Sequence, residues 1–542
     1  MTAMHHLQHI AELGPVLEGL GIRHVILAPG SRNAPLMQLF TSGNRFSCHS
    51  IVDERSAGYV ALGMARQLGQ PVAVVTTSGT AVLNLSPAVA EAYQQCIPLV
   101  VLTADRPREI LTQFNNQVTD QRAPYFNHSK GFFEFPVQVR DLSSLEQDIR
   151  TVEQLVSEAL REPAGPVHVN LPLAEPLYVP LPESALSGVT VNTPSEELPV
   201  PEVLPAVGPG EKKILVLAGM GPGERKVQGA LELLLAHRQA AVVAENISNL
   251  NAPSFVSNPE LVLAGATEEE RRALAPDLIL AFGLQVVSKR LKLFAESCPD
   301  ADLRSLETGT DPVELFRELA GIRPCENRYL TLWKGIEGRE QARVQSFLRE
   351  APFGNLTALA RILEVLPGGT VVHLGNSATI RYSQLIPVNP DLSYFSNRGI
   401  SGIDGSLSTA VGSAMVSDQQ HLLIMGDLSF VYDSNGLWNK DFPENLKVVV
   451  MNDGGGGIFR LLDGPDRMDF FEEFSVTRHP VSLELLAGAF GRRFVRASGM
   501  EELENQLHAL CDPDNRLCIL EVDTTGSENS RIFKSLFTKS DS

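Results

Sequence analysis

Residues 421–459 read HLLIMGDLSFVYDSNGLWNKDFPENLKVVVMNDGGGGIF. Two apolar runs in this stretch, Leu422–Met425 and Leu446–Met451, have the length of buried strands. The polar segment between them, from about Tyr432 to Phe442, has the length of a helix. A strand, a helix and a strand in this order favour two parallel strands joined by a right-handed crossover. The stretch therefore predicts a parallel α/β sheet.

An acidic residue follows each of these two runs. Asp427 comes directly after Gly426, and Asp453 comes directly after Asn452. Open parallel sheets bind ligands beyond the carboxyl ends of their strands. Two carboxylates at that edge suit Mg²⁺, which takes one or two protein carboxylates and completes its octahedron with phosphate oxygens. Glycines 454–457 let the backbone approach a diphosphate closely. For either piece alone, a plain strand–turn–helix with a capping Asp is the alternative.

Gly426-Asp427 and Asn452-Asp453, about 25 residues apart, together resemble the motif with which thiamine diphosphate-dependent enzymes hold Mg²⁺ and the diphosphate. The resemblance implies three metal ligands: the side chains of Asp427 and Asp453 and the carbonyl of Gly455. Asp453 replaces the usual Asn, which keeps an oxygen, adds a negative charge and leaves the choice between Mg²⁺ and Mn²⁺ open. The contacts with the cofactor that the resemblance implies are Glu54, Ser377, Ile403, Gly426, Asp427, Leu428, Ser429, Asp453, Gly455, Gly456, Ile458 and Phe459.

The composition is that of a globular protein with several domains. The chain has 542 residues, 43% of them hydrophobic and 20% charged. Its net charge of −19 argues against nucleic acid or an anionic membrane as the main partner, since both need a basic surface. No apolar stretch is long enough for a membrane span, and the N-terminus lacks the pattern of a signal peptide. The six cysteines are scattered without metal-site spacing, which predicts free thiols in a cytoplasmic protein.

We expect an α/β protein with three parallel-sheet domains. A first domain, residues 1–175, shows strand patterns at His24–Leu27, Val72–Thr76, Pro98–Thr103 and Val167–Leu171, and another ending near Glu54. Helices are expected at Ser56–Leu68 and up to about Gln95. A proline-rich linker follows at 176–209, then a central α/β domain at 210–340, a helical connector at Gly335–Glu350 and a third domain at 355–542. In the central domain the glycines of residues 219–223 are spaced GxGxG, which we interpret as a tight turn rather than a nucleotide site.

Glu54 is a candidate for the proton relay that thiamine diphosphate needs at its aminopyrimidine. By itself, Asp53-Glu54-Arg55 is typical of a charged helix start. The resemblance implies instead that Glu54 hydrogen-bonds the pyrimidine ring, and that Ile403 is the apolar wedge that bends the cofactor. It also implies that the pyrimidine-binding domain precedes the diphosphate-binding domain. In the family the two halves of a site come from different subunits, which implies a homodimer or a dimer of dimers.

Within the family the resemblance is to enzymes of menaquinone biosynthesis that decarboxylate 2-oxoglutarate and add the product to isochorismate. The motifs that carry it are residues 29–33, 53–58, 103–107, 116–117, 289–290, 375–377, 396–399 and 401–405. The catalytic residues that it implies are Glu54, Arg32, Arg106, Gln117, Arg381 and Arg398. The substrate-binding residues that it implies are Ser31, Arg32, Arg106, Asn116, Gln117, Lys289, Arg290, Ser377, Arg381, Arg398, Phe459 and Leu462.

The charges fit these substrates independently. The two substrates bring three carboxylates that survive the reaction, and arginine binds a carboxylate with two parallel hydrogen bonds. Another thiamine diphosphate-dependent 2-oxoacid decarboxylase, or an acetolactate synthase-like enzyme, is the alternative, but their mostly apolar substrates would not need so many cations. A non-catalytic scaffold would have lost Glu54 or the metal ligands, and the sequence has both.

Overall fold

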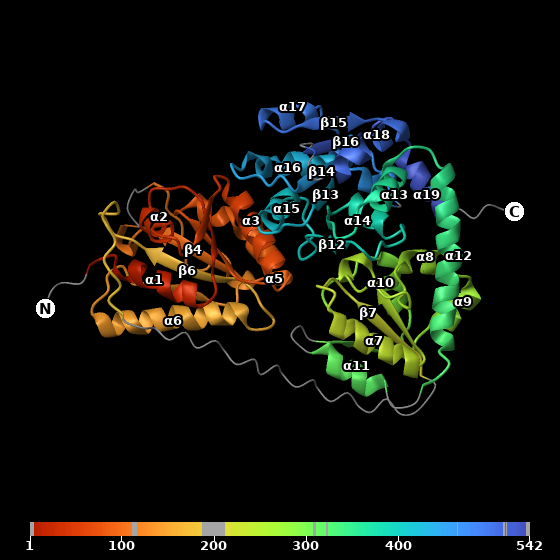
Figure 1. The fold of residues 1–542 in the computed structure, drawn as a ribbon, viewed down its shortest axis with the longest axis horizontal. Coiled ribbons are helices and arrows are strands. Elements are labelled where there is room, and N and C mark those ends of the chain that lie inside the picture. The colour runs from red at the N-terminus through yellow and green to blue at the C-terminus, as the bar shows by residue number, and fades with distance from the viewer. Residues whose placement is uncertain are drawn as a thin grey trace. The chain divides into compact units, whose positions relative to one another are not determined.

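The computed structural model describes residues 5–110, 116–186, 212–306, 311–320, 324–462, 464–512, 515 and 518–537. Within these residues the named strands form three sheets, and all their pairings are parallel. Helices alternate with the strands along the chain (Figure 1). The predicted α/β fold with three parallel sheets is therefore confirmed.

The first sheet has six strands in the order β2-β1-β3-β4-β6-β5. Its strands are β1 (His24–Leu27), β2 (Ser47–Ser50), β3 (Val72–Thr76), β4 (Leu99–Asp105), β5 (Phe132–Glu134) and β6 (Val167–Pro172). The accompanying helices are α1 (Gln8–Gly19), α2 (Ala34–Thr41), α3 (Glu54–Leu68), α4 (Thr80–Asn84), α5 (Ser86–Gln94) and α6 (Leu142–Leu160). The three strands β3, β4 and β6 are buried along their whole length, as expected for parallel strands covered on both faces.

The second sheet has four strands in the order β10-β9-β7-β8. Its strands are β7 (Ile214–Ala218), β8 (Ala240–Ala244), β9 (Leu278–Phe282) and β10 (Asp302–Ser305). The helices of this region are α7 (Arg225–His237), α8 (Pro259–Gly265), α9 (Glu268–Leu274), α10 (Lys289–Glu296), α11 (Pro312–Ala320) and α12 (Arg328–Glu350). The glycine loop after β7 is packed by its own chain, because a Cβ at Gly219 would lie 1.8 Å from the Leu284 carbonyl oxygen. The Asn249 side chain also donates to the Gly221 carbonyl, so the loop is a tight turn.

The third sheet has six strands in the order β12-β11-β13-β14-β16-β15. Its strands are β11 (Val371–Leu374), β12 (Ser393–Phe395), β13 (His421–Gly426), β14 (Leu446–Asn452), β15 (Phe494–Ala497) and β16 (Ile519–Asp523). The helices are α13 (Asn355–Val365), α14 (Ala378–Ser383), α15 (Ser406–Met415), α16 (Asp427–Tyr432), α17 (Leu483–Ala489), α18 (Met500–Cys511) and α19 (Asn529–Phe537). One hydrophobic core joins this sheet to the central region, since Met220, Ile247 and Leu261 pack with Val372 and Ile424.

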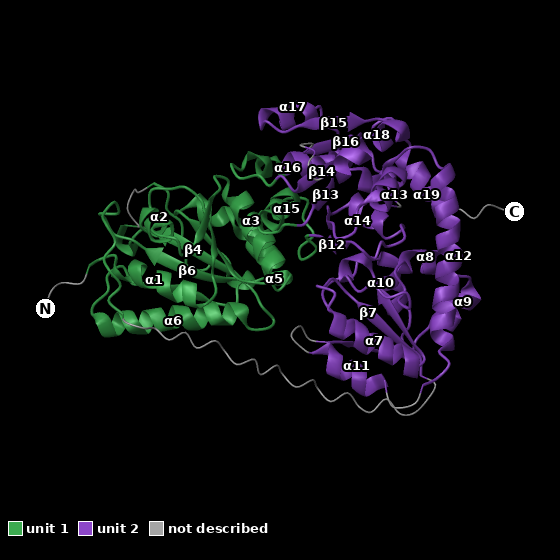
Figure 2. Cartoon of the chain, viewed as in Figure 1, with its two compact units in different colours: residues 1–197, 397–418, 433–443 green, residues 198–396, 419–432, 444–542 purple. Residues whose placement is uncertain are grey.

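The chain divides into two compact units, which Figure 2 colours separately. The first unit comprises residues 1–197, 397–418 and 433–443. The second comprises residues 198–396, 419–432 and 444–542. Helix α15 therefore belongs to the first unit although it follows strands of the third sheet. The domain boundaries expected from the sequence stay predictions, and most of the expected linker at 176–209 lies outside the described residues.

Two expected elements end or begin elsewhere. The helix expected from Tyr432 to Phe442 is wrong: the structure has α16 before it and a 3₁₀ turn at Ser434–Trp438. Asp433 lies between the two elements with φ −105° and ψ 19°, outside the helical region, and its buried carboxylate accepts hydrogen bonds from the Ser408 amide and hydroxyl, both at 2.8 Å. The strand expected to end near Glu54 ends at Ser50.

Glu54 is instead the first residue of α3, and Asp53 caps that helix by accepting from the Arg55 and Ser56 amides. The helix expected to run up to Gln95 is divided into α4 and α5, because Pro87 in the first turn of α5 has no amide to continue α4. The edge strand β5 and helix α6 were not expected.

Two further expectations concern the chain as a whole. All six cysteines are free thiols, as expected. Among the helices of the described residues, none is both long and apolar enough to cross a membrane.

Candidate functional site

The two predicted metal ligands lie at the ends of neighbouring strands. β13 and β14 are paired in parallel from His421 with Leu446 to Gly426 with Met451, so their carboxyl ends lie side by side. Asp427 begins α16 directly after β13, and Asp453 follows β14. The Asp427 side chain is buried and receives a contact of 3.0 Å from His479 Nε2.

Asp453 is held by a second pair of polar groups. The Asn355 Nδ2 donates to Asp453 Oδ2 at 3.0 Å, and Asn355 Oδ1 accepts from the Thr524 hydroxyl at 2.8 Å. Burial and the negative charge of Asp427 raise the pKa of Asp453 to about 7. Burial also raises the pKa of Asp427, while the hydrogen bond from His479 opposes that shift. Two buried carboxylates that repel each other are an arrangement that a divalent cation would stabilise.

The glycine run beside these carboxylates has a backbone conformation and close contacts that leave no room for side chains. Gly455 has a φ of 146°, and a Cβ there would lie 2.5 Å from the Val476 carbonyl oxygen. A Cβ at Gly457 would lie 1.9 Å from Asp453 Oδ2, in the space beside the carboxylate. The run therefore brings backbone groups, rather than side chains, against the two acids.

This donor set fits the divalent cation and diphosphate that the sequence predicts. Hard cations take carboxylate and carbonyl oxygens and keep positions for phosphate oxygens. Among the residues that the structure describes, no cluster of three His, Cys, Asp or Glu side chains could hold a metal ion. The predicted set needs only two side chains, because the Gly455 carbonyl and the diphosphate would supply the other oxygens. The other residues predicted for this end lie beside it in the chain: Gly426, Leu428, Ser429, Gly456, Ile458, Phe459 and Leu462.

The residues predicted for the pyrimidine end lie together in the first unit. Glu54 is half-buried at the start of α3, and its pKa is raised by burial and by the charge of Asp53. One turn along α3, the Tyr59 hydroxyl donates to Asp404 at 3.0 Å. Asp404 directly follows the predicted wedge Ile403, whose side chain is 38% exposed. The start of α3 and the segment before α15 are therefore joined.

Arg32 and Ser31 contact the segment after β6. The Arg32 guanidinium is buried, donates to the Leu173 carbonyl at 3.1 Å and pairs with Glu175 at 3.1 Å. The Ser31 hydroxyl lies 2.9 Å from the Tyr178 hydroxyl. A substrate carboxylate at Arg32 would therefore share the guanidinium with Glu175.

Arg106 and Gln117 lie near the ends of β4 and β3. The Arg106 Nε is buried without a hydrogen-bond partner, as would suit a group that binds an anionic ligand. Gln117 has a φ of 58°, which is uncommon for a residue with a side chain. Two hydrogen bonds to Ser78 hold it there: Gln117 Nε2 donates to the Ser78 carbonyl at 3.2 Å, and the Ser78 hydroxyl donates to the Gln117 carbonyl at 3.1 Å. Asn116 precedes it and is exposed.

Four other predicted substrate residues belong to the second unit. Lys289 and Arg290 begin α10, and Arg290 pairs with Glu260 at 2.9 Å. Burial lowers the pKa of Arg381, and the negative charge of the same Glu260 opposes that shift, so one carboxylate acts on both arginines. Ser377 precedes α14 with a φ of 75°, a strained conformation for a serine. The fifth predicted arginine, Arg398, lies in the first unit.

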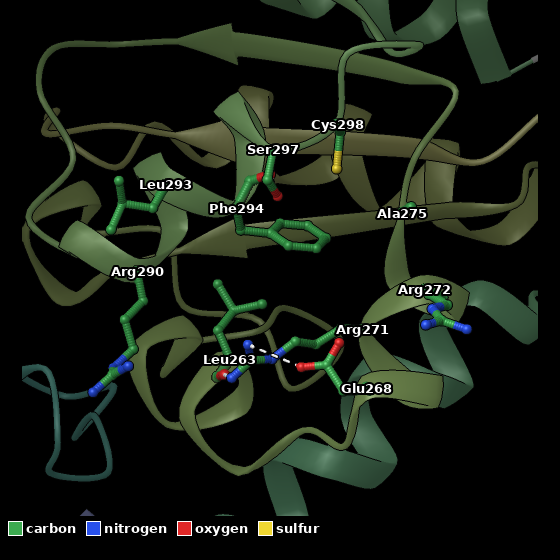
Figure 3. A pocket seen from close by; sticks show the side chains of 10 residues that line it. All are labelled: Leu263, Glu268, Arg271, Arg272, Ala275, Arg290, Leu293, Phe294, Ser297 and Cys298. Carbon is green, nitrogen blue, oxygen red and sulfur yellow. Dashed lines mark hydrogen bonds and ion pairs between the residues drawn. The ribbon is translucent and has the colours of Figure 1, made fainter.

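A cavity of about 460 Å³ opens on the central region beside α9 and α10. Figure 3 shows its lining, in which Leu263, Leu293 and Phe294 form an apolar part and the arginines lie around it. Arg290 is the predicted site residue among the lining residues. The Arg290 guanidinium also lies 5.1 Å from the Phe537 ring. The predicted catalytic residues do not line this cavity.

Sequence reasoning missed two polar residues of the metal end. Asn355 and His479 contact Asp453 and Asp427 from 98 and 52 residues away in the chain. Neither belongs to a motif with recognisable spacing, so only the fold brings them to the acids. The site assignments themselves stay predictions.

Comparison with known proteins agrees with this geometry. Family models described as "Thiamine pyrophosphate enzyme, N-terminal TPP binding domain" and "Thiamine pyrophosphate enzyme, C-terminal TPP binding domain" match residues 11–123 and 375–522. The first match contains strands β1 to β4, and the second contains β12 to β15. Glu54 lies in the first match, and Asp427 and Asp453 lie in the second. The fold and these matches define a thiamine diphosphate-dependent enzyme.

Curated relatives narrow the class. A 2-succinyl-5-enolpyruvyl-6-hydroxy-3-cyclohexene-1-carboxylate synthase from Desulfotalea psychrophila is 38% identical and covers 92% of this chain and 95% of its own. Synthases of the same name from Flavobacterium johnsoniae and Porphyromonas gingivalis are each 34% identical, over 95% and 98% of this chain and 96% of their own. The chain belongs to the 2-succinyl-5-enolpyruvyl-6-hydroxy-3-cyclohexene-1-carboxylate synthase family.

Proposed function

We propose that this enzyme decarboxylates 2-oxoglutarate and adds the resulting four-carbon unit to isochorismate, releasing CO₂, as a step of menaquinone biosynthesis. The observation that carries the proposal is the joint presence of the Asp427 and Asp453 pair, the relay candidate Glu54 and the arginines at strand ends in a chain of this family. An acetolactate synthase-like activity would use the first two features but not the arginines.

The residues of each end have separate tasks. Asp427, Asp453 and the Gly455 carbonyl would hold Mg²⁺ or Mn²⁺, and the ion would hold the diphosphate. When bound, thiamine diphosphate supplies the carbon nucleophile and the electron sink for decarboxylation. Glu54 would hold a proton at the aminopyrimidine, for which its raised pKa is suited. Ile403 would keep the cofactor bent.

We further propose that the cations divide the substrates. Ser377, Arg381 and Arg398 would hold the carboxylate that 2-oxoglutarate keeps. Ser31, Arg32, Arg106, Gln117, Lys289 and Arg290 would face isochorismate. A division is needed because the first substrate must stay anchored while the second arrives. Phe459 and Leu462 would cover the apolar part of the substrates.

We also infer the setting of the enzyme. The family resemblance supports a homodimer or a dimer of dimers, which sedimentation of the purified protein would test. The six free thiols support a cytoplasmic location. The net charge of −19 gives no support to a nucleic-acid partner.

The reaction can be tested with purified protein, thiamine diphosphate, Mg²⁺ and 2-oxoglutarate, following CO₂ release with and without isochorismate. We expect isochorismate to be consumed in step with CO₂. Pyruvate serves as the comparison substrate. If pyruvate is turned over and 2-oxoglutarate is not, the acetolactate synthase-like alternative holds and this proposal fails.

The metal set can be tested by Asp427→Ala. We expect calorimetric titration to show a large loss of thiamine diphosphate affinity, since the variant lacks an anionic ligand of the ion that holds the diphosphate. Removing metal from the unaltered protein with a chelator is the matched control and should cause a similar loss. Affinity of the variant within about threefold of the unaltered protein would contradict the assignment.

A further inference from the structure

The loop of residues 397–401 carries Arg398 and is held by a buried glutamate. Glu91, in α5, accepts the Gly399 amide on Oε1 and the Ile400 amide on Oε2, each at 2.7 Å. Both oxygens of one carboxylate thus bind two consecutive backbone amides of the loop. Such charge-assisted hydrogen bonds are about twice as strong as neutral ones.

Glu91 is a charged group where a helix would ordinarily bury an apolar one. Its side chain is 1% exposed. Gln95 Nε2 donates to it from the next turn. Arg66 supplies a nearby positive charge: burial lowers the Arg66 pKa to about 10, and the charge of Glu91 opposes that shift. A buried carboxylate is costly unless hydrogen bonds or a nearby cation compensate for it, and Glu91 accepts hydrogen bonds from two backbone amides and from Gln95.

Three other contacts fix the same loop. A Cβ at Gly399 would lie 2.9 Å from Gln94 Cβ, so only glycine lets the loop approach α5 this closely. Before Arg398, the Asn397 side chain donates to the Thr409 hydroxyl at 3.0 Å. After it, the Ser401 hydroxyl donates to the Arg398 carbonyl at 3.3 Å. The backbone after Arg398 is therefore tied to α5, and the side chain of the residue before it is tied to α15, all within the first unit (Figure 2).

We propose that Glu91 is a positioning residue that holds the 397–401 loop so that Arg398 meets the retained carboxylate of 2-oxoglutarate. The inference rests on the proposed function, because it uses the substrate assigned there. An arginine fork binds a carboxylate with two parallel hydrogen bonds and so depends on its angle of approach. Glu91 acts on Arg398 indirectly, through the backbone amides of the next two residues.

The test compares Glu91→Gln with Glu337→Gln. Glu337 is a matched control, because it is also buried and accepts two consecutive amides, Ser257 at 2.6 Å and Asn258 at 2.9 Å, beside Lys334. Hydrogen–deuterium exchange should rise at residues 399–400 in the first variant and at 257–258 in the second. The Michaelis constant for 2-oxoglutarate should rise roughly 10- to 100-fold in Glu91→Gln. The constant for isochorismate should change less than about twofold, and Glu337→Gln should change neither.

Several outcomes would overturn the proposal. Unchanged exchange at 399–400 would mean that Glu91 does not hold the loop. Raised exchange with an unchanged constant for 2-oxoglutarate would mean that the loop does not position Arg398. Equal rises of both constants, or the same rise in Glu337→Gln, would reduce the role to general stability.

A second variant and the unaltered enzyme complete the design. Glu91→Asp keeps the charge beside Arg66 but is one methylene shorter, so it should be more stable than Glu91→Gln and still raise the constant for 2-oxoglutarate. An Asp variant with unaltered constants and exchange would count against the proposal. If the unaltered enzyme does not use 2-oxoglutarate, the proposed function fails, whereas the exchange experiment still decides whether Glu91 holds the loop.

Discussion

Asp53 and Glu54 share the two roles that acidic residues have at the start of a helix. As the first residue of α3, Glu54 stabilises the helix dipole, and its neighbour Asp53 caps the helix. Asp53 is itself fixed by the Asn435 side chain, whose Nδ2 donates to Asp53 Oδ2 at 2.7 Å. The carboxyl group of Glu54 is thereby presented from a rigid helix end rather than from a loop.

We expect Glu54→Gln to keep the fold and the binding of the cofactor but to slow its activation. An amide can still donate and accept hydrogen bonds, but it cannot carry the proton of the relay. General acid–base groups typically contribute about 10²–10⁴-fold. Exchange of the thiazolium carbon proton with deuterium in the bound cofactor measures this step directly. Exchange as fast as in the unaltered enzyme would exclude Glu54 as the relay.

The proposed division of substrates predicts opposite effects for two arginines. Arg398→Ala should raise the Michaelis constant for 2-oxoglutarate, and Arg106→Ala that for isochorismate. A hydrogen bond to a charged group is worth about 1.5–3 kcal/mol, or roughly 10- to 150-fold in affinity. Lysine variants should recover only part of the loss, because an ammonium cannot form the paired contact. If both constants shift equally in each variant, the arginines only set the charge of the site.

His9 makes the stability of the protein depend on pH. It is buried in α1, both ring nitrogens lack hydrogen-bond partners, and burial lowers its pKa to about 4. Between about pH 6.5 and 4, His9 is therefore protonated in the unfolded chain and neutral in the folded chain. Stability from this residue is present above pH 6.5 and is lost as the pH falls to 4, by on the order of 3 kcal/mol.

His9→Leu should remove this dependence. The difference between melting temperatures at pH 7.5 and pH 5 should be smaller in the variant than in the unaltered protein. His508→Gln, a change of an exposed histidine, should leave that difference as it is. An equal difference in His9→Leu and the unaltered protein would show that His9 does not carry the effect.

Residues with a fixed spacing could be predicted from the sequence, and residues without one could not. Asp427 and Asp453 each follow an apolar run that is easily recognised as a strand. Because the two strands pair in parallel, both residues lie at the same edge of the sheet. Asn355, His479 and Glu91 act through contacts between segments 52 to 308 residues apart, and no local pattern marks them. The 3₁₀ turn at Ser434–Trp438 was also missed; the residue before it, Asp433, contacts Ser408, which lies 25 residues earlier in the chain.

At the scale of the element, the packing of α3 on α15 depends on two glycines. A Cβ at Gly63 would lie 2.0 Å from the Thr409 carbonyl oxygen, and a Cβ at Gly412 would lie 2.0 Å from the Val60 carbonyl oxygen. The Ser413 hydroxyl adds a hydrogen bond of 3.0 Å to the Gly63 carbonyl. The two helices therefore touch backbone to backbone. Since α3 begins with Glu54 and α15 follows Ile403, this contact fixes the start of α3 relative to the start of α15.

We expect Gly63→Ala to destabilise the protein, because overpacking against a backbone costs typically about 1–3 kcal/mol. Gly338→Ala is the matched control, since Gly338 also lies within a helix and nothing lies within 4 Å of its would-be Cβ. The control should stabilise the protein by about 0.4–1 kcal/mol, because alanine restricts the unfolded chain. Melting temperatures would separate the two. A Gly63→Ala variant as stable as the control would show that the helices can move apart freely.

At the scale of the whole molecule, the first and third sheets repeat one plan. Their strand orders, β2-β1-β3-β4-β6-β5 and β12-β11-β13-β14-β16-β15, correspond strand by strand. Thr409 lies 349 positions after Val60 and Gly412 lies 349 positions after Gly63, so the α3–α15 contact is reciprocal, like the interface of a symmetric dimer. The same offset relates Glu54 to Ile403. The repetition was not visible in the sequence, because the two copies keep the order of their strands rather than their residues.

The N-terminal part of the first unit should not be fully stable as a separate fragment. Residues 1–186 contain the first sheet and α3 but lack α15, which covers Gly63 and its neighbours. We expect the amides of β3 to exchange with deuterium faster in this fragment than in the full chain. Adding the segment 397–418 as a separate peptide should slow the exchange. Equal protection in the fragment and the full chain would show that the sheet is stable without α15.

The alternation of the chain between its two units restricts how such a gene can recombine. The six segments of the two units follow one another in turn, so the polypeptide passes from one unit to the other five times. A chimaera that takes residues 1–186 from a relative 38% identical would join a foreign α3 to a native α15. The glycine contacts between α3 and α15, and the hydrogen bonds from Glu91 to the 397–401 loop, would then join residues from two different proteins. A chimaera that exchanges the first unit should therefore also take residues 397–418 and 433–443 from the same relative. These residues are encoded far downstream of the rest of the unit.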